Sequence, residues 1–180
     1  GIVLILPSQV ADAKMRMFNA DGSEGKMCGN AIRCVGKFLY DHGMTDKTVV
    51  TVETLSGIKT LSLTTEGGKV TKVRVDMGKA ELSPEKIPVN LPGDKIVGRE
   101  TEIAGGTYAI TCVSMGNPHN VIFVEDPYGL DLEKIGPAFE NDPLFPERVN
   151  TEFARIIGKN EIEMRVWERG SGETWACGTG

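Results

Sequence analysis

An internal repeat is the feature that most constrains what this 180-residue chain can fold into. Residues 14–29 align without gaps with residues 163–178 at an offset of 149, which is the separation between Cys28 and Cys177. Met, Arg, Glu, Cys and Gly coincide, and Phe18 matches Trp167. In both copies a strand-like alternation leads into a glycine-containing loop and a Cys-Gly pair. We therefore expect two structurally similar halves, residues 1–82 and 83–180.

Frequent turn residues, 22 Gly and 9 Pro, separate short runs that are rich in Val, Ile and Thr. This composition predicts strands at residues 2–6, 14–18, 48–54, 59–65, 69–76, 107–115, 120–124, 151–157 and 161–167. Apolar residues at helical spacing predict a helix over residues 30–42, with Gly43 as its cap, and a weaker helix over 132–140. The proline-containing segment 82–99 has no periodicity, and we predict a linker there. The fold class is therefore α+β.

Charge and cysteine content limit the partners of the protein. The chain has 20 Lys+Arg against 25 Asp+Glu, for a net charge of -5, and no basic cluster. This balance argues against nucleic acid and anionic membrane surfaces as partners, and no apolar run approaches the roughly 18 residues of a membrane span. Four cysteines are too sparse for a disulfide scaffold, so we expect a cytoplasmic protein. Because the chain opens without Met and stops soon after the second Cys-Gly, we expect an internal segment of a longer protein.

Cys28 and Cys177 are the candidate catalytic groups. Cys28 opens the predicted helix, where first-turn N–H groups favour a thiolate and can bind a carboxylate through Gly29 and Asn30. The repeat predicts a second such turn at Cys177. Two thiols that face one carbon from opposite sides suit an α-carbon racemase or epimerase that works without pyridoxal phosphate.

The cysteines also have simpler interpretations than catalysis. A lone cysteine is more often a small buried hydrophobe than a catalyst, and we expect Cys34 and Cys112 to be of that kind. The chain offers no C-x-x-C pair and only two histidines, so we expect no metal.

His119, Glu168 and Arg169 are further candidates outside the Cys-Gly turns. The sequence before His119, Ser-Met-Gly-Asn-Pro, reads first as a hairpin turn, yet a histidine at a strand end is well placed to support proton transfer. Glu168 and Arg169 read first as an exposed charge pair, although Arg169 could bind a carboxylate and Glu168 an ammonium group. We expect His42, beside the cap, to lie at the surface and compensate the helix C-terminus.

Six segments together closely resemble diaminopimelate epimerases. They are FNADGS (18–23), MCGN (27–30), SMGNPH (114–119), FPERVN (145–150), VWERG (166–170) and ACGTG (176–180). The resemblance implies interconversion of LL- and meso-diaminopimelate, in lysine and peptidoglycan supply, by two bases and without a cofactor. It also implies two similar domains, each a β-barrel-like sheet around a central helix, with the second helix and an N-terminal strand of the family absent here.

The resemblance assigns roles to particular residues. Cys28 and Cys177 would be the acid/base pair, with His119 and Glu168 holding the amino group and tuning the thiols. The residues that would bind the substrate carboxylate are Gly29, Asn30, Gly178 and Thr179. The residues that would hold the distal end of the substrate are Asn19, Asn117, Asn150 and Arg169.

Two alternatives stay open. A proline or hydroxyproline racemase of the same fold also uses two cysteines, and Asn rather than His after Cys28-Gly29 speaks against it. The second alternative is a non-catalytic ligand-binding or redox module in which the cysteines form a disulfide. For either enzyme the expected partner is a small-molecule substrate. The sequence is also compatible with a homodimer.

Overall fold

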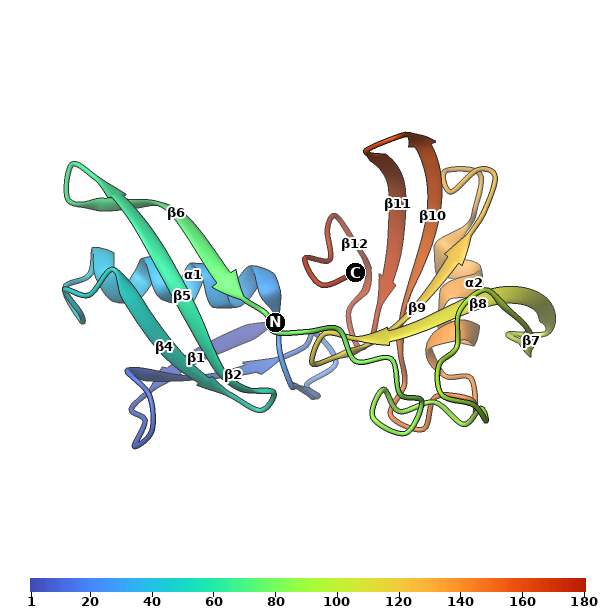
Figure 1. Cartoon of the computed structure of the whole chain (residues 1–180), viewed down its shortest axis with the longest axis horizontal. Coiled ribbons are helices and arrows are strands. Elements are labelled where there is room, and N and C mark those ends of the chain that lie inside the picture. The colour runs from blue at the N-terminus through green and yellow to red at the C-terminus, as the bar shows by residue number, and fades with distance from the viewer. The chain divides into compact units, whose positions relative to one another are not determined.

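The computed structural model describes all residues, 1–180, and divides into two compact units, Gly1–Gly78 and Lys79–Gly178 (Figure 1). Each unit has one mixed sheet and one helix, which confirms the α+β class. The division into two similar domains at residues 1–82 and 83–180 stays a prediction. Neither helix has the length and apolar character that crossing a membrane requires.

The first unit is a six-stranded sheet with one long helix against it. Its elements are β1 (Ile2–Leu6), β2 (Ala13–Phe18), β3 (Glu24–Gly25), α1 (Gly29–Asp41), β4 (Val49–Thr54), β5 (Gly57–Glu66) and β6 (Lys69–Asp76). The strand order is β1-β2-β4-β5-β6, with β3 paired to β2. Only β2 and β4 run parallel, because the chain returns through α1 between them.

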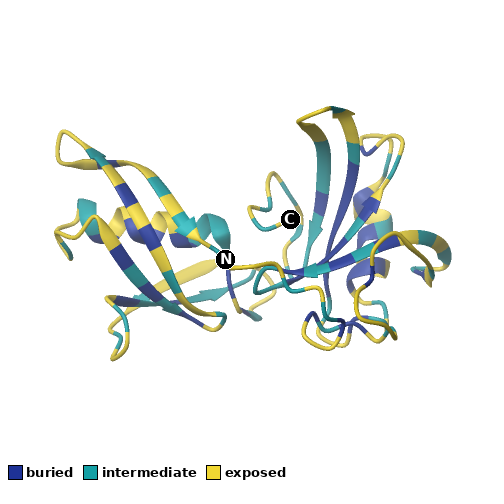
Figure 2. Ribbon diagram, in the orientation of Figure 1, coloured by how far each residue is buried: buried dark blue, intermediate teal, exposed yellow.

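Helix α1 covers the sheet with an apolar face, and the core of the first unit lies beneath it. Ile32, Val35 and Leu39 recur at helical spacing and are buried. Gly36 lets the helix approach β5 closely, because a Cβ there would meet Leu61 Cδ2 at 2.6 Å. Buried and exposed residues alternate along β4, as expected for a strand with one face on a core (Figure 2).

The second unit is also a six-stranded sheet. Its elements are β7 (Arg99–Ile103), β8 (Gly106–Ser114), β9 (Pro118–Phe123), α2 (Leu132–Glu140), β10 (Asn150–Gly158), β11 (Glu161–Glu168) and β12 (Gly172–Thr174). The strand order is β12-β11-β10-β9-β8-β7, and only β9 and β10 run parallel, joined through α2. The first five residues of β10 are all buried, unlike the alternating pattern of β4 (Figure 2).

The segment 82–99 is not the linker that we predicted. Ile87, Val89 and Ile96 are buried in the core of the second unit, beside Phe139 of α2 and Phe153 of β10. The segment has no helix and its only strand residue is Arg99, the first of β7, which is why it lacks periodicity. Its apolar side chains nevertheless belong to a packed core.

The repeat is confirmed in the strand pairing. Strands β1 and β2 pair Ile2 with Phe18, and β10 and β11 pair the positions 149 residues later, Thr151 with Trp167. The short hairpins agree as well: Met17 faces Gly25, and Val166 faces Thr174.

An ion pair recurs with the hairpin. Arg16 binds both carboxylate oxygens of Glu24 at 2.7 and 2.9 Å, and Arg165 binds both oxygens of Glu173 at 2.8 and 3.0 Å. Two copies of one supersecondary unit therefore carry the two Cys-Gly segments.

Most predicted elements are confirmed to within two residues at each end. The sequence patterns missed β3, β7 and β12, of which β3 and β12 have only two and three residues. Too few residues are present in such strands to show an alternation.

Candidate active site

Cys28 is the N-cap of α1, as its position before the amphipathic stretch predicted. Its backbone is extended, with φ -141° and ψ 114°, and its Sγ accepts a hydrogen bond from Ala31 N–H at 3.4 Å. The first-turn N–H groups of a helix carry partial positive charge, and the Cys28 sulfur lies beside them. Gly29 and Asn30 are the first two residues of the helix.

Asn19 lies in the tight turn between β2 and β3. Its N–H donates to the Ser23 carbonyl at 2.8 Å, and its side-chain amide donates to Ser23 Oγ at 3.1 Å. Gly22, with φ 83°, closes the turn through a hydrogen bond from its N–H to the Asn19 carbonyl. The turn is thus held by its own hydrogen bonds.

Cys34 and Cys112 differ in burial. Cys112 is fully buried in β8, and burial raises the pKa of its thiol to about 12, so it is the core residue that we predicted. Cys34 is exposed, contrary to our expectation. It follows Ile32 by two positions, which turns it to the opposite side of α1 from the buried face.

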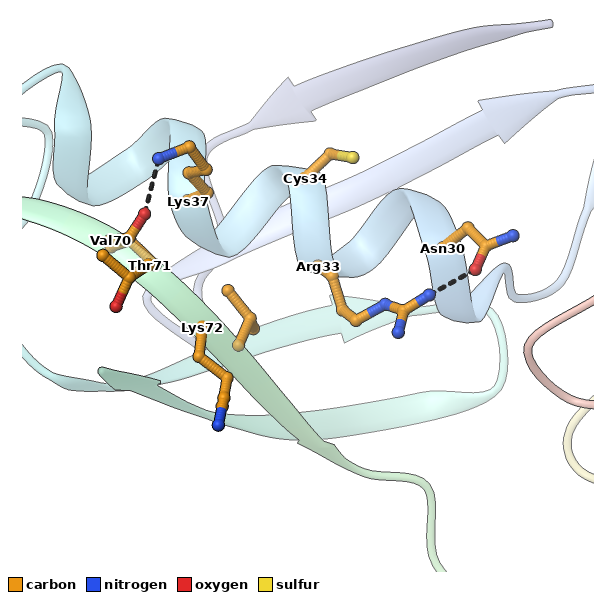
Figure 3. A pocket seen from close by; sticks show the side chains of 8 residues that line it. Asn30, Arg33, Cys34, Lys37, Val70, Thr71 and Lys72 are labelled. Atoms are coloured by element: carbon orange, nitrogen blue, oxygen red, sulfur yellow. Dashed lines mark hydrogen bonds between the residues drawn. The ribbon is translucent and has the colours of Figure 1, made fainter. Parts of the chain in front are cut away.

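A groove runs between α1 and β6, and basic side chains line it. Arg33, Lys37 and Lys72 contribute cations, and Lys37 Nζ donates to the Val70 carbonyl at 2.6 Å (Figure 3). The Arg33 guanidinium donates a hydrogen bond to the Asn30 side-chain oxygen (Figure 3). Asn30 is the sole predicted site residue among those that line this groove, and Cys28 is not one of them.

His42 ends α1 at the surface, as predicted. It is the C-cap residue, its Nδ1 lies 3.1 Å from the Phe38 carbonyl oxygen, and its ring stacks on Phe38. Gly43 follows with φ 68°, the conformation expected of a glycine that ends a helix.

In the second unit, three chemically active side chains converge. Donor atoms of His119, Glu152 and Cys177 all lie within 4.8 Å of one another. His119 is the second residue of β9, Glu152 belongs to β10, and Cys177 follows β12. His119 and Cys177 were predicted site residues, and their proximity supports placing them in one site.

Glu152 is the member that the sequence analysis missed. Both His119 and Glu152 have side chains with 0% exposure, and His119 Nδ1 lies 2.6 Å from Glu152 Oε1. Burial raises the pKa of the Glu152 carboxyl, and the hydrogen bond with His119 opposes that rise. The sequence signal was weak: Glu152 is an acid in a predicted strand that also holds polar residues, and an exposed carboxylate is ordinary there.

These side chains are also of kinds that ligate metals. The short hydrogen bond, however, engages His119 Nδ1 and one Glu152 oxygen with each other. The arrangement is suited to hold and move a proton beside a thiol.

Asn150 holds two backbone segments of the predicted site. Its amide donates to the Pro118 carbonyl at 2.8 Å, and its Oδ1 accepts from Arg169 N–H at 2.9 Å. It therefore connects the start of β9, next to His119, with the loop after β11. Asn117 lies in the turn before β9, where Gly116 has φ 101°.

The side chains of Glu168 and Arg169 each contact a residue other than the opposite charge of the simple pair. Glu168 Oε1 accepts from Thr174 Oγ1 at 2.6 Å, and Arg169 Nη1 donates to the Glu147 carbonyl at 2.9 Å. Gly178 and Thr179 follow Cys177 directly. The roles of all these residues toward a substrate stay predictions.

Comparison with protein families gives one match that spans most of the chain. The family model described as diaminopimelate epimerase matches residues 1–83 and 111–180. A diaminopimelate epimerase of Desulfovibrio desulfuricans is 58% identical over 186 residues, covering all of this chain and 65% of that relative. One of Acetivibrio thermocellus is 58% identical over 180 residues, covering 64% of that relative. The chain therefore spans slightly less than two thirds of these relatives.

Solved structures confirm the fold. A hydroxyproline epimerase from Agrobacterium vitis superimposes with a TM-score of 0.74 at 18% sequence identity, covering 98% of this chain and 55% of the other. A probable proline racemase from Agrobacterium radiobacter gives a TM-score of 0.67 at 20% identity, covering 95% and 54%. At such identities the likeness concerns the fold alone.

Proposed function

The chain belongs to the diaminopimelate epimerase family, and on that premise we propose that the protein interconverts LL- and meso-diaminopimelate. Cys28 and Cys177 act as the two bases. One thiolate removes the α-proton, and the other thiol delivers a proton to the opposite face of the carbon. The reaction is a cofactor-independent isomerisation within lysine biosynthesis, and we assign it to the cytoplasm.

The surroundings of each sulfur support this assignment. Cys28 Sγ accepts an N–H hydrogen bond at the start of α1, where backbone donors surround it. Cys177 lies beside the His119–Glu152 pair, which can hold a proton. The two segments occupy equivalent places after the repeated hairpins, with the same strand register in both. One observation carries the proposal: the two cysteines occupy equivalent positions of the repeat but have different neighbours. An N–H donor lies beside Cys28, and the His119–Glu152 pair lies beside Cys177.

Substrate recognition would use polar groups near both thiols. Gly29 and Asn30 at the start of α1 would bind the carboxylate of the reacting centre, as would Gly178 and Thr179. Glu168 and His119 would hold its amino group. At the distal end the proposed residues are Asn19, Asn117, Asn150 and Arg169.

The test is epimerisation by the full-length gene product and by single cysteine variants. Cys28→Ala and Cys177→Ala should each lower kcat by about 10²-fold or more, because each removes one proton carrier. Cys34→Ala is the matched control and should keep parental kcat, because that thiol is exposed on the far side of α1. In D₂O the parent should place deuterium in the product before the recovered substrate gains any.

Two outcomes would refute the proposal. Full epimerisation by either Cys28→Ala or Cys177→Ala would exclude a two-base mechanism. Racemisation of proline, with no action on diaminopimelate, would assign the protein to the other activity of this fold.

A further inference from the structure

The proposed function gives the buried carboxylate of Glu152 no role of its own beyond its place in the pair with His119. In β10, Glu152 faces Val166 of β11 on one side and Val121 of β9 on the other. Its side chain has no exposure, and its Oε2 atom has no hydrogen-bond partner. A carboxylate in such apolar surroundings opposes folding unless it is paired. A residue that costs stability in this way points to a role in function.

The Glu152 side chain is hydrogen-bonded to His119. The 2.6 Å contact joins Glu152 Oε1 to Nδ1 of the imidazole. When a carboxylate accepts the proton at Nδ1, it fixes the ring orientation and leaves the other nitrogen of a neutral imidazole as the basic one. Cys177 Sγ belongs to the same cluster, within the 4.8 Å that spans all three residues.

Resting on the proposed function of Cys177, we propose that Glu152 is a positioning residue for His119. The Glu152 carboxylate orients the imidazole and, as its negative partner, stabilises the protonated ring beside the Cys177 thiol. Glu152 does not touch the substrate and acts through His119. The proton stays within the His119–Glu152 pair while Cys177 exchanges its own proton with the α-carbon.

Charged and titratable groups around Glu152 agree with this role. His119 approaches from β9, Cys177 from the segment after β12, and Glu168 from the end of β11. The Glu168 charge adds to burial in raising the pKa of Glu152, whereas His119 lowers it. Gly180 also lies against this carboxylate, so closely that a Cβ at this position would clash with Glu152 Oε1. The contact with His119 therefore favours the ionised form of the Glu152 carboxyl, against the effect of burial.

Glu152→Gln separates orientation from charge. The glutamine Oε1 can still accept the Nδ1 proton, but it carries no negative charge to support a protonated ring. We expect kcat to fall at least tenfold. In the profile of kcat/KM against pH, the limb that reflects His119 should move to lower pH. Glu152→Ala removes both the charge and the acceptor, and should lower kcat further.

Stability distinguishes this role from a purely structural one. Glu152→Gln keeps the size of the side chain and an acceptor for His119 Nδ1, so its Tm at pH 7 should stay near the parental Tm while its activity falls. Glu161→Gln is the matched control, since Glu161 is an exposed carboxylate on β11 of the same sheet, and it should leave kcat, the pH profile and Tm unchanged.

A readout without substrate keeps the test independent of the proposed function. The rate of Cys177 alkylation by iodoacetamide, followed by peptide mass spectrometry, should have a pH dependence that Glu152→Gln shifts and Glu161→Gln does not. An unshifted alkylation profile together with an unchanged kcat/KM profile would overturn the role of Glu152. A protein that does not epimerise diaminopimelate yet shows the shifted alkylation profile would refute the proposed function alone.

Discussion

At the scale of single residues, Asp12 shows how one carboxylate ties two distant segments together. It precedes β2, and its Oδ2 accepts hydrogen bonds from the N–H and the Oγ1 of Thr51 in β4, both at 2.8 Å. Its other oxygen pairs with Lys47. The hydrogen bond from Lys47 is the main cause that lowers the pKa of Asp12 to about 2, from an ordinary value of 3.8.

This lowered pKa predicts a loss of stability in acid. The contribution of Asp12 is fully present above about pH 4 and disappears as the pH falls towards 2, because the unfolded chain binds the proton first. At pH 7, Asp12→Asn should lower the free energy of unfolding by about 1 kcal/mol, allowing for solvent screening. Urea unfolding measured from pH 7 to 2 should show this difference shrinking, whereas Asp94→Asn, at an exposed position, should show no such trend. A difference that stays constant with pH would contradict the assignment.

The residue scale is also where the sequence was least informative. Glu152 resembles an ordinary strand carboxylate until its neighbours in β9 and β11 are known, because its burial depends on strands distant in sequence. Cys34 shows the reverse, since the general tendency of lone cysteines to be buried placed in the core a residue that the helical periodicity turns outwards. By contrast, the position of Cys28 was predictable because a helix cap is determined locally.

At the scale of elements, helix α2 stabilises the loop that carries Glu168 and Arg169. The buried Glu140 at its end accepts hydrogen bonds from Trp167 Nε1 at 2.7 Å, Gly170 N–H at 2.9 Å and Arg148 Nη1 at 2.9 Å. Gly136 one turn earlier allows the contact, because a Cβ there would lie 2.2 Å from Trp167 Cδ2.

Glu140→Ala should therefore weaken both stability and substrate binding. Leaving three donors without their acceptor should lower the free energy of unfolding by about 2 to 4 kcal/mol. If the loop binds the distal end of the substrate, KM should rise more than kcat falls. Glu133→Ala, in the exposed first turn of the same helix, should cost less than about 1 kcal/mol and leave KM unchanged. A Glu140→Ala protein with parental stability would show that these hydrogen bonds contribute little.

Elements with a full turn of apolar spacing, or with an alternation of five residues or more, were predictable from the sequence. Helix α2 was placed at its observed bounds, and α1 within one residue. Segment 82–99 and the short strands β3 and β12 were not predictable. Their conformations depend on partners elsewhere in the chain, such as the β8 and α2 side chains that surround Ile87 and Ile96.

At the scale of the whole molecule, each unit has a separate apolar core. Leu61 of β5 is fully buried in the first core, and Leu61→Ala should lower the stability of that unit by about 2 to 5 kcal/mol. Hydrogen exchange followed by mass spectrometry should show faster exchange in β4, β5 and β6 and unchanged exchange in β8, β9 and β10. Faster exchange in both sets of strands would mean that the two units unfold together.

The matched hairpins have an evolutionary consequence. Val3 in the first copy occupies the place that Glu152 occupies in the second, because each pairs with the corresponding position of the next strand, Met17 and Val166. Once an ancestral hairpin has been duplicated, one copy can acquire a buried acid while the other keeps an aliphatic side chain, and neither strand register has to change. The two halves can thus inherit the same backbone and diverge in chemistry, so that natural selection can change the surroundings of Cys28 and of Cys177 independently of each other.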